Sequence, residues 1–300
     1  MKLTIGSRTS QLAMWQTNHV IELLEAMYPD VACEIVPFVT KGDKTLDKPL
    51  PAIGGKGLFT LELENALHAN EIDLAVHSLK DLPVDDAKGL MLGAIIGRAD
   101  TRDAIVAKNG WTLDTLPKGA VVGTSSLRRK AQLLALRSDL QVKSIRGNVG
   151  TRVSKVLNGD YEAAVLAAAG LTRIGLESHI TDYLDFGRML PAPGQGALGV
   201  QCRAADARVL GLLEAVNNEE VRRAVSAERT FLHALGGGCS TPVGALASVE
   251  DLIELRGLVA SLDGKKLIRV EGMGDDPFAL GKALAEDALA LGAQELLGEG

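Results

Sequence analysis

The first hundred residues alternate between strand-like and helix-like patterns of apolar positions. Leu3 and Ile5 flank one polar residue, as in a half-buried strand, and residues 12–24 then repeat apolar side chains at helical spacing. A second strand is expected at 33–39, a helix at 60–69 and a buried strand at 72–76. Residues 41–59 show no sustained period, and so long a loop inside a compact domain is usually functional or mobile. We expect the part from Lys41 to Gly57 to be a mobile lid.

The same alternation begins again after residue 102. Strands are expected at residues 104–106, 120–123, 142–145 and 163–167, with helices at 126–136 and 149–157 between them. Strands that alternate with helices of this length indicate α/β units around a largely parallel sheet. A further strand within residues 190–204 is expected to return to the first domain.

The C-terminal part has a different pattern. A helix is expected at residues 219–235, and the alternating segments 252–258 and 267–270 flank Asp263-Gly264, a good hairpin signal. A last helix is expected at 278–297. The predicted domains are therefore 1–96 with 197–214 (α/β), 102–190 (α/β) and 219–300 (a small α+β domain).

Composition and charge narrow the function. The net charge of -6 and an aromatic content of 3% argue against nucleic acid as a partner, since binding it requires a basic face and stacking platforms. No apolar run reaches the roughly 18 residues of a membrane span. The three cysteines are far apart, which indicates neither a zinc knuckle nor a disulfide framework. With no export signal recognised, a cytoplasmic location is expected, and no bound metal is expected.

Arginines at the ends of predicted strands are the strongest chemical signal. They lie beside glycine and hydroxyl residues, at Arg8, Arg128, Arg129, Arg146, Arg152 and Arg173. In open α/β sheets ligands bind outside the carboxyl ends of strands, and guanidinium forks pair with carboxylates or phosphates. Several such forks favour a small ligand with many anionic groups. The alternative is that the arginines lie on solvated helix faces.

Two further segments carry chemistry. Asp81 follows a buried strand in HSLKDLPV, where a carboxylate can anchor a cation or pass a proton beside Lys80, although it can equally cap a turn. His77 in the same segment is interpreted as structural. Cys239 follows three glycines in a loop and is a candidate nucleophile, whereas Cys33 and Cys202 fall in strands and are interpreted as core residues.

Eight segments taken together resemble one family. They are, in order, GSRTSQLAMWQ, TKGDKTLDKPL, GGKGLF, AVHSLKDLP, VGTSSLRRKAQL, RGNVGTR, PAPGQGALGVQCR and AERTFLHALGGGCSTPVG. They resemble the motifs of the porphobilinogen deaminases. The resemblance implies two periplasmic-binding-protein-like α/β domains with a central cleft, plus a small C-terminal α+β domain. It also implies a monomeric enzyme that joins four porphobilinogen units into hydroxymethylbilane, with loss of ammonia, on a dipyrromethane cofactor, in porphyrin (heme) biosynthesis.

The resemblance also implies the roles of individual residues. Cys239 would carry the cofactor by a thioether, and Asp81 would be the catalytic carboxylate that stabilises the cation left when ammonia departs. The implied cofactor-binding residues are Lys80, Thr124, Ser126, Arg128, Arg129, Arg146, Ser10 and Asp43. The implied substrate-binding residues are Arg8, Arg146, Arg152, Arg173, Gln16, Phe59, Lys56 and Gln195.

The sequence departs from the family pattern in two places. Ala52 stands where some members carry a lysine, and Ser240-Thr241 replaces a common Gln-Val pair after the cysteine. Two rival functions stay open: a non-catalytic anion-binding module, and a phosphate-handling transferase. The second lacks a recognisable nucleotide loop, because GGKGLF does not have the spacing of a Walker A motif.

Overall fold

The computed structural model describes residues 1–44, 57–238 and 241–298. The chain divides into two compact units. Among the described residues, the first comprises 1–44, 57–99 and 196–222, and the second comprises 100–195, 223–238 and 241–298. The predicted fold class is confirmed: the described chain is α/β, with two mixed sheets and a small antiparallel sheet near the C-terminus. The exact three-domain boundaries, and the central cleft, stay predictions.

The first unit is built on a five-stranded sheet in the order β2-β1-β3-β10-β4. Its strands are β1 (Lys2–Arg8), β2 (Ala32–Phe38), β3 (Leu74–Ser78), β4 (Leu90–Arg98) and β10 (Ala197–Arg203). Its helices are α1 (Gln11–Met27), α2 (Lys41–Lys44), α4 (Leu61–His68), the short η1 (Leu79–Asp81) and α8 (Ala207–Glu214). The first three strands in that order run parallel, and β10 is antiparallel to both of its neighbours. The expected return of a strand from residues 190–204 to this sheet is therefore confirmed.

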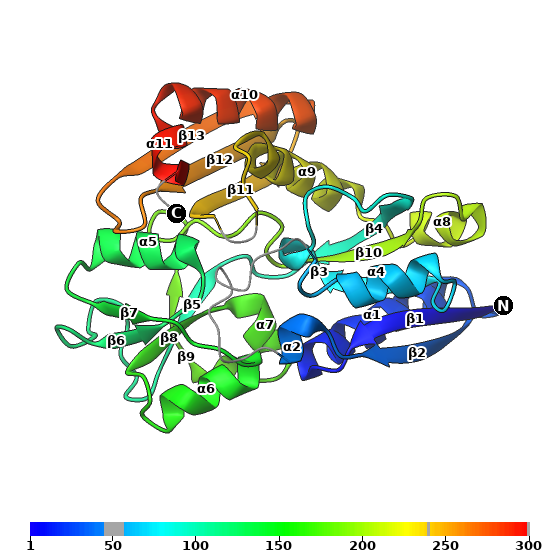
Figure 1. The fold of residues 1–300 in the computed structure, drawn as a ribbon, viewed down its shortest axis with the longest axis horizontal. Helices are drawn as coiled ribbons and strands as arrows, with labels where there is room; N and C mark the ends of the chain where they lie inside the picture. Colours follow the sequence, from blue (N-terminus) through cyan, green and yellow to red (C-terminus); the bar gives the residue numbers. More distant parts are fainter. Residues whose placement is uncertain (45–56, 239–240, 299–300) are drawn as a thin grey trace. The chain divides into compact units, whose positions relative to one another are not determined.

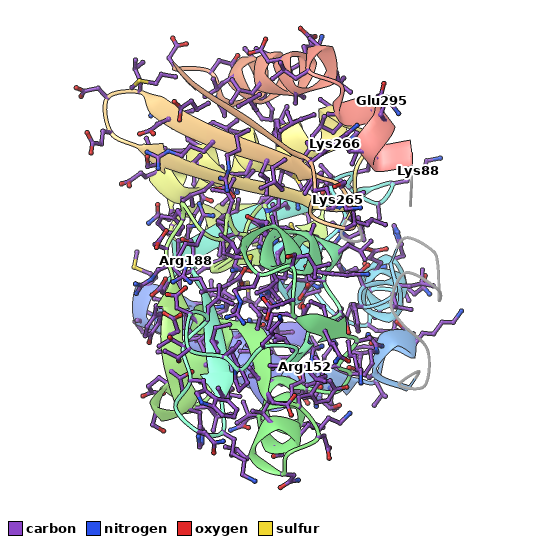
Figure 2. All side chains as sticks on the ribbon, turned by 90° about the vertical axis from the view of Figure 1, so that its left-hand side faces the viewer. Lys88, Arg152, Arg188, Lys265, Lys266 and Glu295 are labelled. Carbon is purple, nitrogen blue, oxygen red and sulfur yellow. The ribbon has the colours of Figure 1, made fainter. Side chains whose placement is uncertain are left out.

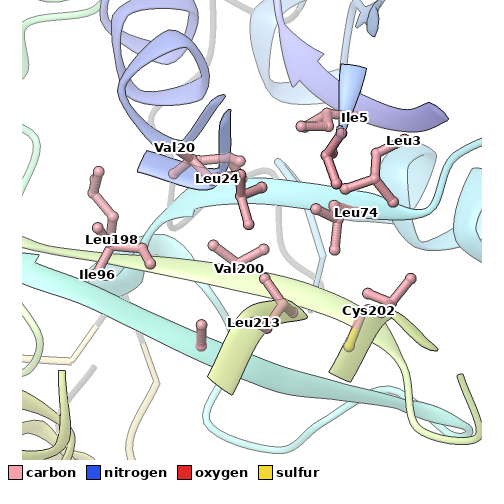
Figure 3. Close-up of a cluster of buried hydrophobic side chains, with 14 residues drawn as sticks. Leu3, Ile5, Val20, Leu24, Leu74, Ile96, Leu198, Val200, Cys202 and Leu213 are labelled. Atoms are coloured by element: carbon pink, nitrogen blue, oxygen red, sulfur yellow. The ribbon is translucent and has the colours of Figure 1, made fainter. Parts of the chain in front are cut away.

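Two apolar layers cover the faces of this sheet. On one face, Val20 and Leu24 of α1 pack with alternate residues of the strands, including Leu3 and Ile5 (Figure 3). Leu213 of α8 belongs to the same cluster. On the other face, α4 packs its apolar stripe over the sheet. The period-two and helical patterns of the sequence thus correspond to a sheet buried on both sides.

The second unit contains another five-stranded sheet, in the order β7-β6-β8-β5-β9. Its strands are β5 (Asp103–Ala107), β6 (Val121–Gly123), β7 (Gln141–Lys143), β8 (Ala163–Ala167) and β9 (Ile180–Leu184). Its helices are α5 (Leu127–Leu136), α6 (Val149–Leu157), α7 (Ala168–Arg173) and the short η2 (Glu177–His179). Three neighbouring strands are parallel and β5 is antiparallel to both β8 and β9. The sheets are mixed rather than largely parallel, because in each of them one strand enters from the opposite direction.

A small antiparallel sheet, β11-β12-β13, follows in the same unit. It comprises β11 (Val243–Val249), β12 (Ile253–Ala260) and β13 (Leu267–Gly274), preceded by α9 (Glu219–Ala234). Helix α10 (Pro277–Ala290) covers it and α11 (Ala293–Gly298) ends the described chain (Figure 1). The single helix expected at 278–297 is wrong, because Gly292 adopts φ +96° and breaks it in two. Strand β11 was not predicted.

The predicted hairpin between β12 and β13 is confirmed and packs against α5. Gly264 lies at its tip with φ +75°, and a Cβ atom there would lie 2.6 Å from the carbonyl oxygen of Ala131. Lys265 and Lys266, both labelled in Figure 2, follow it directly in the sequence. The contact requires glycine both for its conformation and for its lack of a side chain. The hairpin therefore packs against the helix whose first turn carries Arg128 and Arg129.

Within the described ranges, no helix is long and apolar enough to cross a membrane. The same residues include no group of three or more His, Cys, Asp or Glu side chains placed to hold a metal ion.

Candidate active site

Arg8, the last residue of β1, is held by a carboxylate and an aromatic ring. Its Nε donates to Oδ2 of Asp43 at 3.2 Å and its Nη2 pairs with Oδ1 of the same residue. Its guanidinium carbon lies 4.4 Å from the centre of the Phe59 ring. Asp43 also accepts a hydrogen bond from the hydroxyl of Thr40 at 2.7 Å. Burial would raise the pKa of Asp43, but the hydrogen bonds from Arg8 and Thr40 outweigh it and lower that pKa.

The end of β3 presents the segment that carries Asp81. Ser78, the last residue of the strand, accepts a hydrogen bond from Nε2 of the buried Gln16 at 2.8 Å. The η1 turn follows at once, so Lys80 is half-buried and the carboxylate of Asp81 is exposed to solvent. Gln16 therefore ties α1 to the strand end from which Asp81 projects.

His77 precedes this segment and is buried. Burial lowers its pKa to about 4, and the nearby charge of Arg8 acts in the same direction, while the side chain of Gln201 opposes both. The imidazole is therefore neutral near pH 7. Its interpretation as a structural residue agrees with this burial.

In the second unit, Arg128 and Arg129 converge on one carboxylate, that of Asp103. Nη1 of Arg128 donates to Oδ2 at 2.7 Å, and Nη2 of Arg129 donates to Oδ1 at 2.7 Å. Nε2 of Gln195 donates to the same Oδ1 at 2.8 Å. All four side chains are buried. Burial would raise the pKa of Asp103, but the two guanidinium charges outweigh it and hold that pKa well below its usual range.

Three other predicted arginines lie on the α6 and α7 side of the same unit and are half-buried. Burial lowers the pKa of Arg146, and it lowers that of Arg173 to about 10, which still leaves a cation near pH 7. Nε of Arg152, a residue of α6 labelled in Figure 2, donates to the carbonyl of Gly147 at 2.8 Å. The solvated-face alternative is wrong for Arg128 and Arg129, which are 3% and 6% exposed.

The predicted hydroxyl residues lie at helix N-termini. Ser10 caps α1 by accepting from the N–H of Ala13 at 3.3 Å, and Ser126 caps α5 by accepting from the N–H of Arg129 at 3.4 Å. The buried Thr124 accepts from the N–H of Ser126 at 3.2 Å. Each of these oxygens thus has a local structural partner, whatever else it binds.

Cys239, Ser240, Ala52, Lys56 and most of the proposed lid lie outside the described residues. Their predicted roles stay predictions.

Two protein-family models match the chain. One, "Porphobilinogen deaminase, dipyromethane cofactor binding domain", matches residues 3–211, and the other, "Porphobilinogen deaminase, C-terminal domain", matches residues 222–290. The chain belongs to the porphobilinogen deaminase family. Its function is accordingly that of a porphobilinogen deaminase with a dipyrromethane cofactor, in tetrapyrrole biosynthesis.

Curated relatives agree with this family. The porphobilinogen deaminase of Brevibacillus brevis is 49% identical over 300 residues, covering 99% of this chain and 97% of its own. That of Pelotomaculum thermopropionicum is 50% identical over 299 residues, covering 99% and 96%. Among solved structures, the methionine binding protein MetQ has a TM-score of 0.46 at 14% identity, covering 76% of this chain and 94% of its own.

The buried cluster of the second unit fits the cofactor of the porphobilinogen deaminases. Two guanidinium cations share one carboxylate there, so one positive charge is left over. Among the described residues, Nε of Arg128 is buried without a hydrogen-bond partner. A buried donor of this kind is costly unless a ligand satisfies it. The carboxylate side chains of a dipyrromethane have the charge and the acceptors that this donor lacks.

Sequence reasoning missed two buried carboxylates of this family member. Asp103 was not singled out, although a charged residue directly before the apolar run Ala104–Val106 was a usable signal. Glu228 of α9 accepts from the N–H of Gly194 and from the N–H of Ala247, both at 2.7 Å. It joins α9 and β11 to the segment that carries Gln195. No pattern within the helix distinguishes Glu228 from a solvent-facing glutamate.

Proposed function

We propose that the chain joins four porphobilinogen units into hydroxymethylbilane, with loss of one ammonia per unit, on a primer bound to the thiol of Cys239. When bound, the dipyrromethane supplies the pyrrole carbon to which the first unit is joined. The other two thiols are poor candidates for its attachment. Burial raises the pKa of Cys202 to about 11, and burial also raises the pKa of Cys33. Because the thiolate is the reactive form of cysteine, both are disfavoured as nucleophiles.

The observation that carries the proposal is the buried arginine cluster in a chain of net charge -6. Each pyrrole of the product carries an acetate and a propionate, so the growing chain brings two carboxylates at every addition. We assign Arg128 and Arg129, with Thr124 and Ser126 at the same helix start, to the carboxylates of the cofactor. Arg146, Arg152 and Arg173 are assigned to carboxylates of the substrate and the growing chain.

In the first unit, Asp81 is assigned the chemical role. Loss of ammonia leaves a pyrrole whose ring N–H bears positive charge, and an exposed carboxylate can accept a hydrogen bond from that N–H and stabilise the cation. Lys80 and Ser10 are assigned to the cofactor. Gln16 holds Ser78 and so fixes the strand end that carries Asp81.

Arg8 is assigned to a substrate carboxylate, and Asp43, its ion-pair partner, is assigned to the cofactor. Each is partly exposed, at 22% and 16% of its side chain, and Phe59 supports the guanidinium from one side. Such a pair can exchange its partner when a substrate carboxylate arrives, because its desolvation is incomplete. We also propose that the chain acts as a monomer in the cytoplasm, consistent with free thiols at Cys33 and Cys202.

Intact mass of the purified protein tests the proposal. Wild type should carry a covalent excess of two pyrrole units, as should Cys33→Ala and Cys202→Ala. Cys239→Ala should lack both the excess and activity. A non-catalytic anion-binding module would show no excess in any of the four proteins, and a dipyrromethane on Cys33 or Cys202 would overturn the assignment.

A further inference from the structure

The hydrogen bonds of the cluster engage every side-chain nitrogen of Arg129 but only Nη1 of Arg128. Nε and Nη2 of Arg129 both donate to Oδ1 of Asp103, at 3.1 and 2.7 Å, and its Nη1 donates to the carbonyl of Val165 at 3.1 Å. Both hydrogen bonds of Arg128 start from Nη1, to Oδ2 of Asp103 at 2.7 Å and to the carbonyl of Leu190 at 2.6 Å. The Nε–Nη2 edge of Arg128 is the one bidentate edge of the two guanidiniums that these bonds do not engage.

The fold does not require a carboxylate at this position. Asp103 pairs with Ala167, the last residue of β8, and in the sheet of the first unit Leu198 pairs with Ser78, the last residue of β3. Since the two sheets have matching strand order, Leu198 occupies the position that corresponds to Asp103. It is apolar and 1% exposed. Buried ion pairs are often no more stabilising than apolar residues of similar volume, so the charge of Asp103 calls for a reason other than stability.

We propose that Asp103 is a positioning residue that makes this cluster a receptor for a single carboxylate. By holding Arg129 and Nη1 of Arg128, it leaves one guanidinium edge and one net positive charge, which match one carboxylate in geometry and in charge. This refines the assignment of both arginines to the cofactor: Arg128 contacts the ligand carboxylate directly, and Arg129 acts through Asp103. This inference rests on the proposed function, because the carboxylate is taken to belong to the covalently bound cofactor.

The two arginines therefore have unequal roles, and lysine substitution separates them. In Arg129→Lys the ammonium can still pair with Asp103, and the net charge of the cluster is unchanged. In Arg128→Lys the charge is also unchanged, but the bidentate edge is lost. We expect the cofactor-bearing fraction, read from intact mass, to be at least tenfold lower in Arg128→Lys than in Arg129→Lys. A purely structural cluster predicts the opposite order, because Arg129 makes more of the hydrogen bonds.

Asp103→Asn tests the carboxylate itself, with Asp73→Asn as a matched control. Asp73 also holds two arginines, Arg203 and Arg208, at 3.1 and 2.8 Å, but it precedes β3, at the end of the strand opposite to Ser78 and Asp81. Both substitutions should lower the thermal unfolding temperature, whereas the cofactor-bearing fraction should fall at least tenfold in Asp103→Asn alone. If Asp103→Asn does not fold, the lysine pair decides.

The outcomes distinguish a failure of the proposed function from a failure of the proposed role of Asp103. Wild type without the two-pyrrole excess would overturn the proposed function. Wild type with the excess, together with equal loading of Arg128→Lys and Arg129→Lys or a fully loaded Asp103→Asn, would overturn the role of Asp103 alone.

Discussion

The two five-stranded sheets have matching strand order, yet they hold their arginines in opposite ways. At the end of β1, Arg8 pairs with one carboxylate, and both partners keep contact with solvent. At the start of α5, Arg128 and Arg129 are buried with Asp103, which is fully inaccessible. A partly exposed pair can release its carboxylate for a ligand at small cost, whereas a buried cluster is organised before the ligand arrives. By our assignment, the same topology holds an exchangeable contact in one unit and a fixed anchor for the cofactor in the other.

The same comparison distinguishes the residue that we assign to the reaction from the residues that we assign to cofactor binding. The carboxylate that we assign to the reaction, Asp81, follows the central strand of the first sheet and is exposed. At the matching place in the second sheet, β8 runs directly into α7, whose first residues are apolar and buried. Equivalent strand ends of the two sheets therefore differ by a few side chains, without a change of fold.

Among substitutions that leave the cofactor in place, Asp81→Asn is expected to lower turnover the most. The fold and the covalent cofactor should persist, because the side chain is exposed, while turnover should fall by roughly 10²–10⁴-fold, the usual range for a lost proton-transfer group. Steady-state rates on cofactor-loaded protein measure this effect. Asp86→Asn, which changes another exposed carboxylate nearby, is the control. Near-normal turnover of Asp81→Asn would show that Asp81 only caps a turn and has no role in the reaction.

A second prediction concerns the buried histidine of the first sheet. His77 has a folded-state pKa of about 4, below its value in the unfolded chain, so the unfolded state binds the proton more readily. The free energy of unfolding should therefore fall as the pH drops from neutral toward 4, by up to about 3 kcal/mol from this group.

Urea unfolding at pH 7 and pH 4.5 measures this dependence. His77→Gln should lose part of the difference between the two pH values, and His68→Gln, at an exposed position, should keep all of it. An unchanged pH dependence in His77→Gln would show that the imidazole is not held neutral by burial.

The smallest effects are expected at two helix caps that follow the equivalent strands β1 and β6. Ser10→Ala and Ser126→Ala each remove one capping hydrogen bond, so each should lower the free energy of unfolding by about 1 kcal/mol. Chemical denaturation measures this loss, with Ser248→Ala on β11 as a substitution that removes no cap. A much larger loss at Ser126 alone would indicate that it supports the buried cluster beyond its capping role.

Local patterns predicted most of the fold, since they depend on neighbours in sequence. The alternation of Leu3 and Ile5 and the Asp263-Gly264 turn both correspond to observed elements. Strand β11 was missed because its small residues give a weak apolar pattern, and the break at Gly292 was missed because glycine is tolerated within helices. The mixed character of the sheets depends on strand pairings between distant segments, which no local period encodes.

The candidate site was predicted only in part for the same reason. Arginines at strand ends are visible in the sequence, and their burial at Arg128 and Arg129 agrees with a specific role. Their partner Asp103 lies 25 residues from Arg128 along the chain and meets it only through the sheet. The pairing of Arg8 with Asp43 likewise joins residues 35 apart.

The most direct test of the account counts pyrroles on the enzyme. Wild type, Asp81→Asn and Arg128→Leu are each mixed with limiting porphobilinogen, and their intact masses are recorded over time. Wild type should start with two pyrrole units and show successive additions. Asp81→Asn should start with two and add further units far more slowly, while Arg128→Leu should carry none. Equal additions in Asp81→Asn and wild type, or a full primer in Arg128→Leu, would contradict the separation of reaction and anchoring between these residues.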